Sequence, residues 1–265
     1  MFTLFLPITT SDVDAIKHEL TVCLPHVKSS HRCEAIARGF GFLTYASLKV
    51  ASTTANPPNQ IADGMRFSAY LAEHGFAVPS TVFYHAAARR ALQGAMAAMP
   101  RLTLAGIGIG ARQWKLSEGR WETASERKAK FDSERAALVG DFPVRQFLIS
   151  LALLSRVQRT KTVRPKTNSY WLKHVAEKYK CTYPDGQPLG PSYVANGAFI
   201  AAAAHAGFTI QTHVDDGGYC SLNTTFNMPF STLAELDIEI RGDGASVFSR
   251  RRRASERYGA VGFLP

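Results

Sequence analysis

The chain has 265 residues, of which 46% are hydrophobic and 20% charged, and this composition excludes general disorder. A formal net charge of +10 makes nucleic acid a more natural partner than the small substrate of a metabolic enzyme. No segment approaches the roughly 18 consecutive apolar residues of a membrane span, and the four cysteines come without a secretory signal. We therefore expect a cytoplasmic protein with no membrane partner.

Helical patterns dominate the first hundred residues. After a short apolar first strand, capping residues and apolar spacing predict helices over residues 10–24, 29–38, 44–51, 61–74 and 80–99. Residues 56–59, Asn-Pro-Pro-Asn, form the clearest linker. We expect an N-terminal three-helix unit over residues 1–55, followed by a helical region with a β-hairpin over residues 60–155.

Helices and short strands alternate in the remainder. The pattern predicts a strand over residues 102–109, a hairpin over 113–123, helices over 124–139, 144–156, 169–179 and 196–206, and strands over 208–214 and 220–226. The third predicted unit, residues 156–265, is a basic segment plus a C-terminal α+β domain. The expected fold class is α+β and predominantly helical, with a small antiparallel sheet in the C-terminal part.

Three short segments share one pattern, in which an apolar residue is followed after three positions by Gly-Phe. They are ARGFGF, LAEHGF and AAHAGF, which end at Phe42, Phe76 and Phe208. The pattern predicts a helix end at which the glycine is left-handed and the phenylalanine packs back on the helix. It indicates helix termini and not an internal duplication.

The positive charge is concentrated between residues 145 and 180, where nine Lys and Arg stand against the single Glu177. The densest run, residues 156–166, is followed directly by hydroxyl, amide and aromatic side chains. Cations neutralise phosphates and aromatic rings stack on bases. The predicted nucleic-acid contacts are Arg156, Arg159, Lys161, Arg164, Lys166, Tyr170, Trp171, Lys173, Lys178 and Lys180.

Other interpretations of the basic segment stay open. A charge run is also typical of a solvated loop, Tyr170 and Trp171 can pack inward, and a basic patch fits an acidic protein surface as well as nucleic acid. A second run, Arg250 to Arg253 with Arg257 behind it, is interpreted as an auxiliary anion contact. The acidic residues that could instead balance this run are Glu235, Asp237, Glu239 and Asp243.

Residues 36–50 have the spacing of a helix-turn-helix, with Ala37 where two helices would cross and Gly41 in the turn. The residues that the second helix would present to a major groove are Thr44, Tyr45, Ser47 and Lys49. The same glycine spacing fits an ordinary helix cap in a compact three-helix packing unit, and this interpretation is favoured.

Four residues have the ligand types of a zinc site: Cys23, His26, His31 and Cys33. On a helix, His31 and Cys33 would point about 200° apart, which favours buried thiols and surface histidines. We expect neither a metal nor another cofactor. Because the sequence shows no paired carboxylates, nucleophile elbow or phosphate-binding loop, we also expect no enzymatic activity.

Two stretches resemble known sequences. They are residues 30–48, SHRCEAIARGFGFLTYASL, and residues 169–228, which include SYWLKHVAE, YVANGAFIAAAAHAGF and NTTFNM. Both are similar to recurring segments of poorly characterised accessory proteins of bacterial conjugative plasmids and related mobile elements. The resemblance implies a cytoplasmic bacterial or phage-plasmid setting and carries no activity or catalytic residues.

The leading hypothesis is a non-enzymatic nucleic-acid-binding accessory or regulatory protein of a mobile element. The alternative is an anti-defence inhibitor, similar in role to an anti-CRISPR protein, that uses the same patch to bind a host nucleic-acid-processing complex. A hydrolase or nuclease has the least support, because no cluster of carboxylates and histidines is visible in the sequence.

Overall fold

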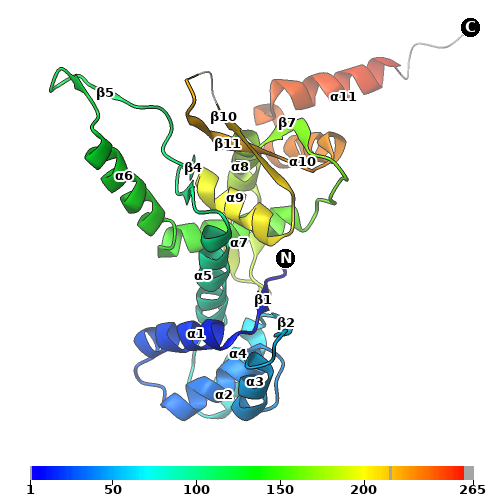
Figure 1. Cartoon of the computed structure of the whole chain (residues 1–265). Helices are drawn as coiled ribbons and strands as arrows, with labels where there is room; N and C mark the ends of the chain where they lie inside the picture. Colours follow the sequence, from blue (N-terminus) through cyan, green and yellow to red (C-terminus); the bar gives the residue numbers. More distant parts are fainter. Residues whose placement is uncertain (1, 215–216, 260–265) are drawn as a thin grey trace, which may run out of the picture.

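The computed structural model describes residues 2–214 and 217–259, with side chains described up to residue 253. Within these residues the chain forms eleven α-helices and five small antiparallel sheets, which confirms the predicted α+β, predominantly helical fold class. The first helices form one end of the molecule, and a long helix connects them to the small sheets and C-terminal helices at the other end (Figure 1). A hairpin and one helix project as an arm.

The N-terminal end is built from four helices and a two-stranded sheet. Its strands are β1 (Phe5–Pro7) and β2 (Asn59–Ile61), and its helices are α1 (Thr10–Cys23), α2 (Ser29–Gly39), α3 (Tyr45–Ser52) and α4 (Gly64–Glu73). Thr9 caps helix α1, and its hydroxyl accepts a hydrogen bond from the backbone N–H of Asp12 in a capping box. Helix α2 packs against both α3 and α4.

The three Gly-Phe segments end helices in the predicted way. Gly41, Gly75 and Gly207 have φ angles of +82°, +82° and +80°. The N–H of each following phenylalanine donates to the carbonyl five positions earlier, as in Phe42 to Ala37 at 2.9 Å. The left-handed backbone conformation at these positions favours glycine, and the predicted helix ends are confirmed.

The centre of the molecule is a packed group of helices. Its elements are α5 (Thr81–Ala98), α7 (Asp141–Leu154) and α9 (Asn196–His205), with the short strands β3 (Leu102–Thr103) and β4 (Gly106–Ile107) against α9. The first turn of α9 approaches the β3–β4 turn so closely that a Cβ on Gly197 would lie 1.8 Å from the carbonyl oxygen of Thr103. Asn196 Nδ2 donates hydrogen bonds to the carbonyl of Ala105, in the β3–β4 turn, and to that of Leu222, in the later strand Cys220–Phe226. These bonds connect α9 to both segments.

The C-terminal part contains a three-stranded sheet in the order β10-β11-β7. Its elements are β7 (Arg164–Asn168), α8 (Ser169–Lys178), β8 (Cys181–Thr182), β9 (Pro188–Gly190), β10 (Ile210–Val214), β11 (Cys220–Phe226), α10 (Phe230–Arg241), a 3₁₀ turn (Gly242–Gly244) and α11 (Val247–Gly259). The sequence pattern did not predict β7, α10 or α11. Strand β7 accommodates Pro165 because it lies at the sheet edge, where a missing N–H need not break a central ladder.

The projecting arm consists of the hairpin strands β5 (Trp114–Lys115) and β6 (Arg120–Trp121) followed by α6 (Ala124–Ala137). The hairpin was predicted and is confirmed by the antiparallel pairing of Trp114 with Trp121. No residue of α6 is buried, so this helix has solvent on most of its surface.

One hydrophobic core extends from Phe2 to Leu236 and includes residues of all three predicted units. The expected boundary near residues 55–60 lies between β1 and β2, which pair through Leu6 and Gln60. Helix α7 of the second expected unit packs against α9 of the third. Contacts therefore cross both expected boundaries.

In the described part of the chain, no single helix has the length and apolarity needed to cross a membrane. Helices α6 and α7 meet those criteria only when taken together, and the chain bends by 64° between them.

Candidate nucleic-acid interface

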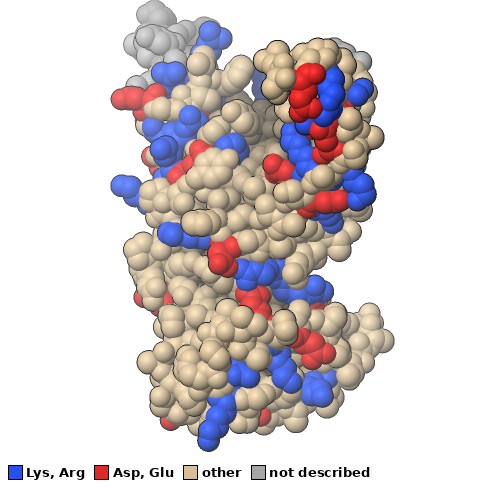
Figure 2. Space-filling model, turned by 90° about the vertical axis from the view of Figure 1, so that its left-hand side faces the viewer, with Lys and Arg blue, Asp and Glu red and all other residues tan. Residues whose placement is uncertain are grey.

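Helix α10 brings the two basic runs of the sequence into one region. Strand β7, which carries Arg164 and Lys166, packs against α10, and α11, which carries Arg250 to Arg253, packs against it as well. Figure 1 shows β7, α10 and α11 at the same end of the molecule. On the face seen in Figure 2, many blue side chains lie on the upper half of the molecule.

Seven exposed Lys and Arg side chains lie on the loop before β7, on β7 itself and on α11, and we call them the basic surface. They are Arg159, Lys161, Arg164, Lys166, Arg250, Arg251 and Arg253. Among the described residues, none of them forms an ion pair. The ammonium group of Lys166 lies 5.8 Å from the ring centre of Phe230, and Arg159 donates to the carbonyl of Gly207 at 3.2 Å. Two further predicted contacts, Lys178 and Lys180, are also exposed. The side chain of Arg257 lies outside the described side chains.

Two of the predicted contacts are neutralised within the protein. Arg156 donates two 2.7 Å hydrogen bonds to the two carboxylate oxygens of Glu239 on α10, and this pairing raises the pKa of Arg156 and lowers that of Glu239. Lys173 is buried, and its ammonium group lies 2.9 Å from a carboxylate oxygen of Glu177, one helical turn away. Their positive charges are thus balanced without an external anion.

The two aromatic residues at the start of α8 differ in accessibility. Tyr170 is 54% exposed, with its ring edge-on to His174 and the Lys173 ammonium group 5.3 Å from its centre. Trp171 is half-buried against Phe230, and its indole N–H donates to Asp237 at 3.0 Å. Tyr170 therefore offers the more accessible ring for stacking.

Asp237 is fully buried and holds α11 in place. Its carboxylate accepts hydrogen bonds from the backbone N–H of Ser246 at 2.8 Å and from the hydroxyl of Ser249 at 2.7 Å, in addition to the bond from Trp171. Arg241 contributes an ion pair at 3.2 Å. Burial alone would raise the pKa of Asp237, but these hydrogen bonds and the arginine outweigh it and lower the pKa.

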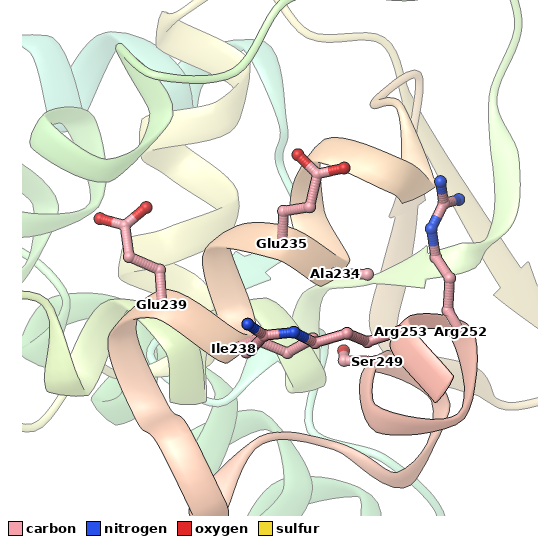
Figure 3. A pocket seen from close by; sticks show the side chains of 7 residues that line it. All are labelled: Ala234, Glu235, Ile238, Glu239, Ser249, Arg252 and Arg253. Atoms are coloured by element: carbon pink, nitrogen blue, oxygen red, sulfur yellow. The ribbon is translucent and has the colours of Figure 1, made fainter. Parts of the chain in front are cut away.

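Glu235 and Glu239 of α10 border a cavity of about 430 Å³ between α10 and α11. Figure 3 shows Glu235 and Glu239 on α10 and the side chain of Arg253 extending from α11 towards α10. Two of the acidic residues that could balance the charge of the arginine run thus have other roles in the folded protein. Glu239 pairs with Arg156 of the other basic run, and Asp237 anchors the backbone of α11 instead of its guanidinium groups.

The residues predicted to read a major groove lie at the start of α3. The hydroxyls of Thr44 and Ser47 serve a capping box, in which the Ser47 N–H donates to Thr44 at 3.1 Å. Tyr45 is half-buried, and its backbone N–H donates to Glu34 at 2.9 Å. Lys49 is exposed. Groove reading by these four residues stays a prediction.

The four residues with zinc-ligand chemistry face different surroundings. Cys23 is exposed and Cys33 is buried, whereas the ring of His31 lies 4.7 Å from that of His74 and 5.4 Å from that of Phe76. In residues 2–214 and 217–259, no three His, Cys, Asp or Glu side chains are grouped so that they could hold a metal ion.

Comparisons of the chain with protein-family models, with curated proteins and with solved structures find no match. The similarity to plasmid accessory proteins stays a prediction.

Sequence reasoning missed α10 and with it the contacts of Phe230 and Glu239. The run from Phe230 to Arg241 has apolar residues at helical spacing after Pro229, and this signal could have identified the helix.

Proposed function

We propose that this chain is a non-enzymatic nucleic-acid-binding accessory or regulatory protein of a mobile element that acts in the cytoplasm. The observation that supports it best is the basic surface itself. Two basic runs that are far apart in sequence lie on elements packed against α10, and the seven cations of the basic surface form no ion pair among the described residues. Like charges gathered in this way repel one another, and a polyanion removes that repulsion.

Phosphate neutralisation gives the proposal a measurable signature. Each phosphate contact releases condensed counterions, so the logarithm of the affinity falls with the logarithm of salt concentration by about 0.9 per contact on duplex DNA. If all seven cations of the basic surface contact phosphates, the slope is about −6. The exposed ring of Tyr170 adds a stacking platform on single strands.

The test is a fluorescence anisotropy titration with labelled single- and double-stranded DNA and RNA over a series of salt concentrations. One variant replaces Lys161, Arg164 and Lys166 with alanine. The matched control replaces three exposed cations outside the basic surface with alanine: Lys28, Arg101 and Lys128. The first variant is expected to lose affinity and about three units of salt slope, while the control keeps both. Absence of binding at low salt, or equal losses in the two variants, overturns the proposal.

The same samples test the non-enzymatic part of the proposal. Incubation of the protein with each nucleic acid and Mg²⁺ is expected to leave the strands intact. Cleavage that is retained through purification of the protein and lost on its thermal unfolding would make the chain a nuclease.

One observation favours the second candidate, an anti-defence inhibitor that binds a host nucleic-acid-processing complex. Val247 and Phe248, at the start of the arginine-bearing α11, are 51% and 66% exposed. Aromatic and arginine side chains side by side are enriched in protein interfaces. Pull-down from nuclease-treated host lysate tests this candidate. Stoichiometric capture of one protein that is lost in Phe248→Ala supports it, and failure to capture any protein argues against it.

A further inference from the structure

A cavity of about 440 Å³ opens beside the basic segment, where β1 meets the ends of α7 and α9. Leu151, Leu154 and Val157 make much of its wall apolar, and all three are buried. This volume lies within the range of small-molecule sites, about 300–1,000 Å³. An apolar cavity of this size can take up a flat heterocycle.

His205, the last residue of α9, lines this cavity, and its ring lies 5.5 Å from that of Phe147. Its Nε2 atom is buried and has no hydrogen-bond partner among the described residues. A buried polar atom without a partner costs free energy, which a ligand's hydrogen bond would recover. Burial also lowers the pKa of His205 to about 4, so the imidazole is neutral near pH 7. A neutral ring nitrogen matches the edge of an uncharged heterocycle better than it matches a phosphate.

His205 also borders a smaller cavity of about 250 Å³ that is lined in part by Asp12 and Arg90. These two side chains already form an ion pair with each other. We therefore consider the larger cavity as the ligand site, because the charged groups of the smaller one are already paired with each other.

The remaining wall of the larger cavity adds aromatic rings and a cation. Phe5 on β1 is 45% exposed, whereas Phe208, which also lines the cavity, is buried. Arg159 of the basic surface also lines the cavity, and within the described part of the chain one N–H of its guanidinium group is engaged, by the carbonyl of Gly207. Guanidinium has five donors, so others remain for an anion. An aromatic ring, a neutral hydrogen-bonding nitrogen and a cation are the groups that a nucleotide requires.

We propose that this cavity receives one unstacked base of a single-stranded nucleic acid, which packs on Phe5 and has its phosphate on Arg159, while a rotation of the His205 ring brings the buried Nε2 atom to the edge of the base. The inference rests on the proposed function and narrows it to single strands, because a base paired within a duplex cannot enter the cavity. The rest of the strand continues over the basic surface.

The experiment compares a labelled single strand with a duplex of the same sequence by anisotropy, and adds a single strand that contains one 2-aminopurine. Phe5→Ala is the test variant, because truncating a half-exposed ring leaves the core intact. The control is Phe142→Ala, an 81% exposed phenylalanine at the opposite end of α7 from the cavity. Thermal melts check that both variants fold.

We expect Phe5→Ala to lower single-strand affinity about tenfold and to leave duplex affinity unchanged. The 2-aminopurine fluorescence change on binding should be lost in the same variant, and Phe142→Ala should behave as the parent protein. His205→Phe keeps a ring but removes Nε2, and is expected to weaken single-strand binding in the same direction.

The outcomes separate this inference from the proposed function. Salt-dependent binding that is equal for single strand and duplex, and unchanged in Phe5→Ala, overturns the base-binding cavity and leaves the basic surface standing. Absence of nucleic-acid binding at low salt overturns both.

Discussion

The indole N–H of Trp171 donates a 3.0 Å hydrogen bond to the buried carboxylate of Asp237, 66 residues further along the chain. The same carboxylate accepts bonds from Ser246 and Ser249, so one side chain links α8, α10 and α11. A tryptophan that follows a basic run in sequence is a natural base-stacking platform. In the folded protein its polar edge instead helps to hold the arginine-bearing helix.

Asp237→Asn should loosen α11. The bonds from Trp171, Ser246 and Ser249 all end on Oδ2, where an uncharged amide oxygen would accept them more weakly, and the amide NH2 group would face the guanidinium of Arg241 in place of Oδ1. We expect the free energy of unfolding to fall by about 2 kcal/mol. Limited trypsin digestion should cut faster within the arginine run. Glu235→Gln, on the exposed side of the same helix, is the control, and equal cleavage rates in the two variants would refute the anchoring role.

His205 should make the protein less stable in mild acid. In the unfolded chain this imidazole takes up a proton near pH 6.5, whereas burial lowers the pKa of His205 in the folded protein to about 4. Between these pH values the unfolded state holds more protons, so the free energy of unfolding falls as pH drops from 6.5 to 4, by about 3 kcal/mol in total. This contribution to stability is complete above pH 6.5.

Urea denaturation of the parent protein and of His205→Phe at pH 7.5, 5.5 and 4.5 measures the effect. The difference between the two proteins isolates His205 from His85, whose pKa burial lowers as well, and from the carboxylates. The variant should lose less stability in acid. Parallel stability curves would mean that His205 is not buried as described.

Arg164→Ala and Arg156→Ala remove the same charge but should have different effects. Arg164 is exposed and unpaired among the described residues, so its loss should reduce the salt slope of nucleic-acid binding by about 0.9 and leave stability unchanged. Arg156 is paired with Glu239, so its loss should cost about 0.5–1 kcal/mol of stability, as expected for a solvent-accessible pair. Anisotropy titrations over salt and urea denaturation of both variants test this contrast. Equal changes in slope would show that the Glu239 pair opens on binding.

Gly197→Ala should prevent stable folding, because the new Cβ would lie 1.8 Å from the backbone oxygen of Thr103. Relief of this clash requires a shift of the backbone, which is more costly than a shift of a side chain. We expect a loss above about 3 kcal/mol, or insoluble protein. Gly94→Ala in α5 is the matched control, since nothing lies within 4 Å of its Cβ position. That variant should gain about 0.5–1 kcal/mol from helix propensity. Thermal melts of the two variants measure the change in stability. A Gly197→Ala variant as stable as the parent protein would contradict the close packing of α9 on the β3–β4 turn.

Local chemistry made part of this fold predictable. The helix ends at Gly41, Gly75 and Gly207 follow from a left-handed glycine and a phenylalanine within six residues, and the hairpin at Trp114 and Trp121 depends on a short turn. The helical character and the concentration of charge between residues 145 and 180 are likewise properties of the sequence alone.

Only the tertiary structure decided which positive charges are free to bind an external anion. Arg156 meets Glu239 across 83 residues, and Trp171 meets Asp237 across 66, on a helix that the sequence pattern did not predict. Strand β7 forms because β11 lies beside it, despite Pro165 within the strand. A helix cap is determined by neighbours a few residues away, whereas an ion pair or a buried hydrogen bond depends on which distant elements pack together. The sequence by itself therefore determined how much positive charge this protein carries and where the helices before Gly41, Gly75 and Gly207 stop, and the packing of α10 decided that Arg156 is paired within the protein.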